Sequence, residues 1–257
     1  MAAFLSLLYG TVCYLAFLAT FLYAIAFVGN IGVPRSIDLG PAAPVGEALV
    51  INLALLALFA VQHSIMARRG FKKWWTRFVP WSVERSTFVL AATAALALLL
   101  WQWRPITEPV LWRVDDTVGA SILMAVFWLG WAMLLASTFL INHFELFGLQ
   151  QVWTRFRGRE MQPPQFRTPL FYRYVRHPIY VGFLLAFWAT PVMTAGHLLF
   201  AVATTGYILI GIWFEERDLV AYYGGRYRAY QKQVGMLFPR LRGKGPAIAE
   251  EDQANVR

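Results

Sequence analysis

The sequence predicts an all-α fold: a polytopic integral membrane bundle of four spans and a C-terminal helical hairpin, with five to six transmembrane helices. Five stretches contain no Asp, Glu, Lys or Arg, namely 4–29, 48–67, 86–103, 117–141 and 179–213. Crossing the hydrocarbon core takes roughly 20 apolar residues. The 23 basic and 14 acidic residues all lie between or beyond these stretches. No hydrophilic block is long enough for a soluble domain, so residues 1–257 are expected to form one membrane domain.

The first four stretches each have the length of one crossing, whereas the fifth is too long for one. Pro191 and Gly196 lie near its middle, where a helix would end and turn. We therefore expect a tight hairpin with arms 179–192 and 194–213, the first arm being short for a full span. The first stretch of the chain is longer than the apolar part of a signal peptide and follows no basic segment, so we expect it to be retained. Residues 240–257 are expected to be a disordered tail.

The distribution of basic residues predicts the orientation. Six basic residues follow the second span, six lie in 142–178, and eight lie in the tail from residue 214 onward. The two remaining loops carry only Arg35, Arg104 and Arg113. Because cytoplasmic loops are enriched in Lys and Arg, both termini are predicted to lie in the cytoplasm.

Several classes of site are not indicated. The net charge of +9 is spread over three segments beside the membrane, so anionic lipid headgroups explain it and nucleic acid is not an expected partner. The four histidines, His63, His143, His177 and His197, lie in separate segments without metal-ligand spacing, so no metal site is predicted. For His63 and His197 we expect structural roles. The single cysteine, Cys13, excludes a disulfide within the chain, and no phosphate loop, dinucleotide fingerprint or nucleophile elbow occurs.

The polar residues that flank the hairpin form the candidate pocket, on the cytoplasmic side. Arg176-His177-Pro178 precedes the first arm and Glu215-Glu216 follows the second. Pro178 suits the first position of a helix, where free backbone N–H groups favour a carboxylate. The carboxylates and nearby tyrosines suit a cation or an amine. A zwitterion with an additional positive charge would satisfy both sides. S-adenosylmethionine is such a ligand, although the residue pattern alone does not single it out.

The same residues carry a family resemblance. Arg-His-Pro-x-Tyr-x-Gly at 176–182, Glu215-Glu216, Leu219, Tyr223-Gly224, Tyr227, Tyr230 and Phe238-Pro239 resemble the C-terminal signature of isoprenylcysteine carboxyl methyltransferases and their membrane relatives. Phospholipid methyltransferases share the core of this signature. Two upstream segments, 142–149 (Asn-His-Phe-Glu-Leu-Phe-Gly-Leu) and 168–174 (Thr-Pro-Leu-Phe-Tyr-Arg-Tyr), resemble a narrower branch, the bacterial methanethiol S-methyltransferases. They extend the likeness over nearly the whole chain.

The resemblance implies an enzyme of a bacterial inner membrane that methylates methanethiol to dimethyl sulfide with S-adenosylmethionine, releasing S-adenosylhomocysteine. The cofactor-binding candidates are Gln150, Tyr174, Arg176, His177, Pro178, Tyr180, Gly182, Glu216, Tyr227 and Tyr230. A thiolate would attack the sulfonium methyl group in line, so catalysis needs mainly positioning and desolvation.

Because the thiolate is the nucleophile, a group must remove the thiol proton. The catalytic candidates are His143, Glu145 and Glu215, with Tyr180 or Tyr227 as orienting partners. His143 and Glu145 are two residues apart and point in different directions on a helix, so at most one should reach the thiol. A neutral imidazole suits proton removal near neutral pH, and a carboxylate suits a cationic donor.

Two alternatives remain open: a methyltransferase for a prenylated, lipid or larger thiol acceptor, and a non-enzymatic membrane accessory protein of the same fold. A lipid acceptor needs a groove open to the bilayer and lined with small residues. Methanethiol needs a closed pocket packed by aromatic side chains, for which Phe144, Phe147 and Trp213 are available. The expected partners are a small-molecule thiol and membrane lipids, and the oligomeric state is left open. Transporters usually bury charges within their spans, and these spans contain none, so a transport function is not expected.

Overall fold

The computed structural model describes residues 1–163 and 165–240. Within these ranges five helices are long and apolar enough to cross a membrane: α1 (Ala2–Val28), α2 (Val45–Ala67), α4 (Trp81–Gln102), α5 (Thr117–Ile141) and α9 (Ala195–Tyr223). At a rise of about 1.5 Å per residue, each exceeds the roughly 30 Å of a hydrocarbon core. The predicted polytopic helical bundle is confirmed, and the chain is an integral membrane protein.

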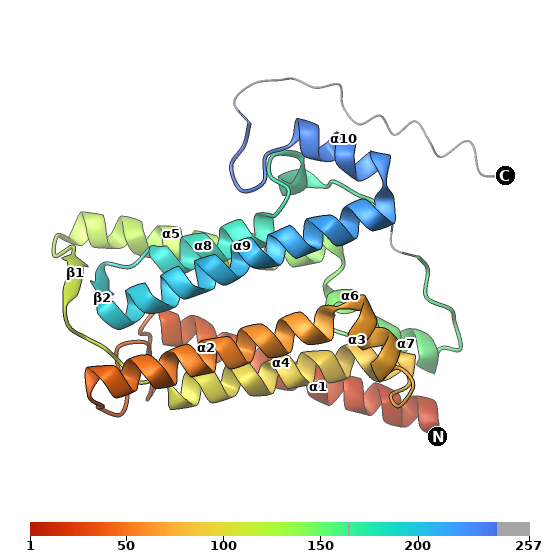
Figure 1. Cartoon of the computed structure of the whole chain (residues 1–257), viewed down its shortest axis with the longest axis horizontal. Coiled ribbons are helices and arrows are strands. Elements are labelled where there is room, and N and C mark those ends of the chain that lie inside the picture. Colours follow the sequence, from red (N-terminus) through yellow and green to blue (C-terminus); the bar gives the residue numbers. More distant parts are fainter. Residues whose placement is uncertain (164, 241–257) are drawn as a thin grey trace.

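Shorter elements connect the long helices: α3 (Arg69–Trp75), α6 (His143–Leu146), α7 (Leu149–Phe156), the 3₁₀ helix η1 (Leu170–Arg173), α8 (Pro178–Trp188), α10 (Gly225–Gln233) and the strands β1 (Val110–Arg113) and β2 (Val192–Thr194). The two strands pair antiparallel, with Trp112 opposite Met193, at the end of the bundle remote from the N-terminus (Figure 1). The sequence did not predict this small sheet, because segments of three or four residues show no readable periodicity.

The long helices form two layers. Figure 1 shows α5, α8 and α9 in one layer and α1, α2 and α4 in the other, in agreement with the contacts between helices. The layers meet in an aromatic core. Trp103 packs edge-to-face against Phe27 of α1 and Phe200 of α9, and Trp131 of α5 packs edge-to-face against Phe21 of α1. Apolar contacts between the layers therefore hold the bundle together.

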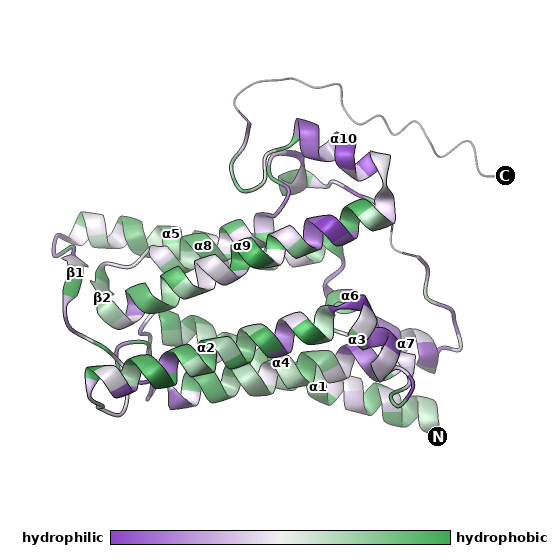
Figure 2. Ribbon diagram, in the orientation of Figure 1, coloured by the Kyte–Doolittle hydropathy of each residue, from purple (hydrophilic) through white to green (hydrophobic). Residues whose placement is uncertain are grey.

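Hydrophilic residues gather at one end of the bundle. Figure 2 shows apolar residues along most of the length of the helices, and hydrophilic residues concentrated around α3, α6, α7, α10 and the last turns of α9. The N-terminus lies at the same end (Figure 1). This end holds the candidate pocket and is called the polar end below.

The C-terminal hairpin is asymmetric. Its first arm, α8, has 11 residues and spans only about 16 Å, because the helix ends at Trp188 before Pro191 and the β2 strand. The Thr194 side chain accepts a hydrogen bond from the backbone N–H of His197 and caps the start of α9. The second arm continues beyond the predicted limit at 213 to Tyr223, so Glu215 and Glu216 lie on α9 itself. Apart from Arg240, the predicted tail 240–257 lies outside the described residues.

Helices α5 and α8 approach each other closely at two glycines, Gly130 and Gly182. A Cβ atom on Gly182 would lie 2.6 Å from the carbonyl oxygen of Gly130 and 2.8 Å from the backbone nitrogen of Leu134. Backbone atoms cannot move aside as a flexible side chain can. The position of α8, and of the polar residues at its start, therefore depends on a small residue at Gly182.

We predict that Gly182→Ala lowers the free energy of unfolding by about 1–3 kcal/mol, the usual cost of overpacking a filled interface. The measurement is denaturant unfolding of the purified protein in detergent micelles. Gly206→Ala on α9 is the matched control, because a Cβ atom there meets no neighbour within 4 Å. Equal stability of the two variants would contradict the packing role of Gly182.

Candidate active site

The carboxylate of Glu216 joins three segments at the polar end. Its Oε1 atom accepts a hydrogen bond from Arg176 Nε at 2.6 Å and lies 3.0 Å from His177 Nε2. Its Oε2 atom accepts a hydrogen bond from Gln231 Nε2 at 2.9 Å. Arg176 also donates to the backbone carbonyls of Gln231 and Val234. The Arg176 side chain is only 8% exposed and that of Glu216 17%, so this group, called the Glu216 cluster, is a largely buried ion pair.

The segment after α10 runs beside the start of α8. The backbone N–H groups of Arg176 and His177 donate to the carbonyls of Gly235 at 2.8 Å and Met236 at 3.2 Å. Helix α8 then begins at Pro178, which is buried. The first N–H groups of any helix have no partner within the helix, so an anion could be bound at this start.

Glu215 differs from its neighbour Glu216 in its environment. Tyr180 Oη donates a hydrogen bond to Glu215 Oε2 at 2.9 Å, and His177 Nδ1 lies 3.8 Å from the same oxygen. The Glu215 side chain is 44% exposed. Its carboxylate therefore keeps an open side that can receive a cation, whereas the carboxylate of Glu216 is already surrounded by donors.

Several cofactor-binding candidates make packing contacts. Tyr227 and Tyr230 are buried against Phe166, and Tyr230 Oη donates to the carbonyl of Tyr172. Burial raises the pKa of the Tyr172, Tyr227 and Tyr230 hydroxyls, so all three stay protonated. Tyr174 is exposed and lies outside the cluster. Gly182 packs against α5, as described above.

His143 is held by two hydroxyl groups. Its Nε2 atom lies 2.8 Å from Tyr14 Oη, and its Nδ1 atom lies 2.9 Å from Thr138 Oγ1. Thr138 donates its own proton to the carbonyl of Leu135. His143 Nδ1–H therefore donates to Thr138, and Nε2 accepts from Tyr14. Burial lowers the pKa of His143, which keeps the ring neutral. Neither ring nitrogen is free to take a proton directly.

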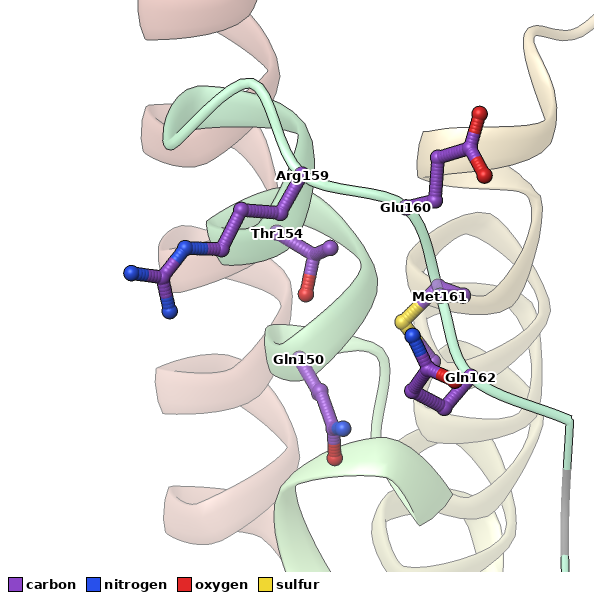
Figure 3. A pocket seen from close by; sticks show the side chains of 6 residues that line it. All are labelled: Gln150, Thr154, Arg159, Glu160, Met161 and Gln162. Carbon is purple, nitrogen blue, oxygen red and sulfur yellow. The ribbon is translucent and has the colours of Figure 1, made fainter.

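Asn142 organises the start of α6 and α7. Its Nδ2 atom donates to Glu145 Oε2 at 2.8 Å and to Gln150 Oε1 at 2.5 Å, while its Oδ1 atom accepts from the backbone N–H of Glu145. Gln150 lines a cavity of about 530 Å³ together with Thr154, Arg159, Glu160, Met161 and Gln162. Figure 3 shows Gln150 and Thr154 on α7 beside Met161 and Gln162 of the following loop, with Arg159 extending away. Both the volume and the polar groups suit a small polar ligand.

The predicted site residues thus fall into two groups. Glu215, Tyr180, His177 and Arg176 belong to or adjoin the Glu216 cluster, whereas His143, Glu145 and Gln150 lie around Asn142. Within the described ranges no hydrogen bond or ion pair joins the two groups directly. They approach each other at the end of α9, where Tyr223 lies in the neighbourhood of Glu145. No group of three or more His, Cys, Asp or Glu in the described residues is arranged to hold a metal ion.

Four further residues make specific side-chain contacts and were not selected from the sequence as site residues. Gln231 completes the Glu216 cluster from α10, and Tyr14 of α1 holds His143. His63 of α2 pairs with Tyr207 of α9, with 2.8 Å between His63 Nδ1 and Tyr207 Oη. The one available signal was the presence of His63 and Tyr207 within apolar spans, where polar side chains are rare and often functional.

The sequence of the chain is similar to those of several known proteins. No family model matches the chain, and no solved structure matches it. The chain is 58% identical to the methanethiol S-methyltransferase of Mycobacterium tuberculosis over 239 residues, which are 93% of this chain and 98% of that protein. It is 56% identical to methanethiol S-methyltransferase 2 of Bradyrhizobium diazoefficiens over 235 residues, or 91% and 90% of the two chains. A more distant similarity, 30% over 179 residues, relates 66% of the chain to 68% of Nurim from Bos taurus.

We predict that Glu216→Gln lowers the free energy of unfolding by roughly 3–5 kcal/mol, because it leaves the buried Arg176 guanidinium without its carboxylate. Asp218→Asn is the matched control. Asp218 pairs with Arg68 and Arg69 through exposed side chains, and such pairs contribute about 0–1 kcal/mol. Thermal and denaturant unfolding of both variants checks the difference. Similar losses in the two variants would refute the central role of Glu216.

The lowered pKa of His143 predicts a pH dependence of stability. In the unfolded chain this imidazole binds a proton below about pH 6.5, while in the folded protein it stays neutral to lower pH. Its contribution to stability is therefore present above about pH 6.5 and is lost as the pH falls, by at most about 1.4 kcal/mol per pH unit. His143→Gln should flatten the stability curve between pH 7 and pH 5. Tyr14→Phe, which keeps the imidazole, should retain the slope. Parallel curves for wild type and His143→Gln would contradict this origin.

Proposed function

Because the chain belongs to the methanethiol S-methyltransferase family, we propose that it methylates methanethiol to dimethyl sulfide with S-adenosylmethionine as the methyl donor. The observation that carries this proposal is the 58% identity, over 93% of the chain, to a relative of that name. The membership predicted from the sequence motifs is confirmed by this identity. The identity of the donor as S-adenosylmethionine is part of the proposal. Its support is the chemistry of the side chains and N–H groups at the polar end.

The donor proposed here carries a sulfonium, an amine and a carboxylate. The open carboxylate of Glu215, with Tyr180 beside it, is suited to the positive groups. The N–H groups at the start of α8 are suited to the carboxylate. Arg176 and His177 contribute by holding Glu216, and through it the turn that precedes Pro178. The cavity beside Gln150 offers amide and hydroxyl partners for the hydroxyl groups and base of the nucleoside.

In the proposed reaction the thiolate sulfur forms a bond to the methyl carbon as the carbon–sulfur bond of the sulfonium breaks. S-adenosylhomocysteine leaves as a neutral thioether. An anion and a cation are consumed, so the transition state carries less separated charge than the reactants. A site that excludes water therefore favours the transfer, and the protein's main contributions are positioning and desolvation.

The proposed location is a bacterial inner membrane, with the polar end and both termini in the cytoplasm. The support is the excess of basic residues beside the polar end, where Arg68 precedes α3 and Arg69, Lys72 and Lys73 lie on it. The methyl donor is a charged, water-soluble molecule, so a site at this end is open to the compartment that would supply it.

A larger thiol acceptor is the second candidate, and one observation favours it. An apolar groove of about 380 Å³ lies between α5 and α8, lined by Val126, Val181, Leu184, Leu185, Trp188, Ala189, Leu237 and Phe238. The side chains lining it are mostly large, whereas a lipid groove was expected to be lined with small ones. Of the aromatic residues expected to pack a closed pocket, Phe147 stacks on Phe17, but Phe144 and Trp213 are exposed.

Purified full-length protein, incubated with S-adenosylmethionine and a panel of thiols, tests the acceptor. We predict that dimethyl sulfide from methanethiol is the dominant product by gas chromatography, with little methylation of a larger alkanethiol or of prenylcysteine. Calorimetry with S-adenosylmethionine provides the control for donor binding. A dominant prenylcysteine product would favour the larger acceptor, and absence of donor binding would favour a non-enzymatic protein.

A further inference from the structure

The four histidines differ in the state of their ring nitrogens. Both nitrogens of His143 are occupied by hydroxyl groups, and both nitrogens of His177 face carboxylates. His197 lies near the start of α9, at the opposite end of the bundle. Its Nε2 atom contacts the backbone carbonyl of Phe187, and its Nδ1 atom is buried without a partner in the described residues. His63 Nδ1 lies 2.8 Å from Tyr207 Oη. In the described part of the chain, His63 Nε2 has no hydrogen-bond partner and is not enclosed by protein atoms. In the described residues two ring nitrogens have no partner, His197 Nδ1 and His63 Nε2, and of these His63 Nε2 lies toward the proposed donor site.

Aromatic rings fix the orientation of His63 between three helices. The imidazole stacks on Phe59 of its own helix, α2, with ring centroids 5.6 Å apart at 27°. Phe88 of α4 lies 5.0 Å away, and Tyr207 of α9 stands edge-on at 6.3 Å. These contacts place the half-buried His63 between α2, α4 and α9. Such a wall is apolar and aromatic, and it suits a small apolar thiol.

Two tyrosines lie between His63 and the proposed donor site. Tyr207 lies in the neighbourhood of Tyr180, and Tyr180 donates a hydrogen bond to Glu215. Tyr207 and Glu215 are eight residues apart on α9, which is about 12 Å along the helix axis. His63 therefore lies about two helical turns farther from the polar end than Glu215, on the side where the bundle is apolar.

We propose that His63 is the catalytic base of this methyl transfer and that Tyr207 is the residue that orients it, an inference that rests on the function proposed above. The thiol binds between Tyr180 and His63. Its S–H bond breaks as an N–H bond forms at His63 Nε2, and the electron pair stays on sulfur. The sulfur then bonds to the methyl carbon while the carbon–sulfur bond of the donor breaks. For Nε2 to accept a proton, Nδ1 must carry one and donate it to Tyr207 Oη, and the 2.8 Å between these two atoms suits that tautomer.

The charged groups around His63 suit this role. Arg68, between α2 and α3, and Arg85 of α4 are the charged groups that act on the imidazole, and Tyr207 faces it from α9. Two positive charges favour a thiolate at this place. After the methyl transfer the proton on Nε2 passes to water, which regenerates the base.

His63→Gln tests the proposal, because an amide keeps the polarity of the site but does not accept a proton from a thiol. We expect kcat for methanethiol to fall about 10²- to 10⁴-fold at neutral pH, the usual effect of losing a positioned base. The dissociation constant of S-adenosylmethionine, measured by calorimetry, should not change. The loss in kcat should become smaller as the pH is raised from 7 to 9, because the solvent then supplies thiolate.

Two further variants make the test specific. Tyr207→Phe should lower kcat about tenfold with unchanged donor affinity, the effect of losing one orienting hydrogen bond. If His63→Gln does not fold, the kcat of Tyr207→Phe tests the proposed role of His63. Gln62→Leu is the matched control and should keep wild-type kcat, because the amide of this neighbour contacts Met66 of its own helix.

Wild-type kcat in His63→Gln, or a loss that is the same at every pH, would overturn the proposal. If His63→Gln does not fold, wild-type kcat in Tyr207→Phe would overturn it. In either case dimethyl sulfide formation by the wild type would leave the proposed function standing. Absence of dimethyl sulfide from the wild type would instead count against the proposed function itself.

Discussion

The geometry of the polar end depends on the carboxylate of Glu216. One side chain on α9 accepts from Arg176 and faces His177, which precede α8, and it accepts from Gln231 of α10. Each of these groups would be costly to bury without the others, so their positions are interdependent. Glu215 follows from the same constraint, because the next residue on a helix is rotated by about 100°. With Glu216 directed to Arg176, Glu215 is directed to Tyr180 and keeps an open side.

The bilayer explains why the chemistry gathers at one end. Charged side chains are costly within the hydrocarbon core, so the spans hold the bundle together through aromatic and aliphatic contacts such as those of Trp103 and Trp131. The charged groups therefore lie near the ends of the spanning helices. The reaction proposed here joins a charged, water-soluble donor to a small apolar acceptor. The Glu215–Tyr180 and Tyr207–His63 pairs lie between the polar end, which suits the donor, and the apolar part of the bundle, which suits the acceptor.

The candidate residues differ in how directly they can act. Arg176 and His177 were expected to contact the methyl donor, and their hydrogen bonds are instead made to Glu216. His143 was expected to be a base, and its ring is enclosed by Tyr14 and Thr138. Their proposed contribution is to hold the walls of the site in place. Among the described residues Glu215 keeps an open side and His63 Nε2 has no hydrogen-bond partner, so the proposed direct contacts with donor and thiol are assigned to them.

The sequence by itself determined the helical bundle, the positions of its long helices and the family. Charge-free stretches of about 20 residues can only cross a bilayer as closed backbone structures, and Pro191 marks the turn of the hairpin. It also showed that Arg176, His177, Glu215 and Glu216 share one end, because the chain goes out and returns. Only the tertiary structure decided which side chains meet. His63 and Tyr207 are 144 residues apart and Tyr14 and His143 are 129 apart, without a shared pattern. Such pairs depend on how each helix is rotated and tilted against its neighbours, and that is set by packing such as the approach of Gly182 to Gly130.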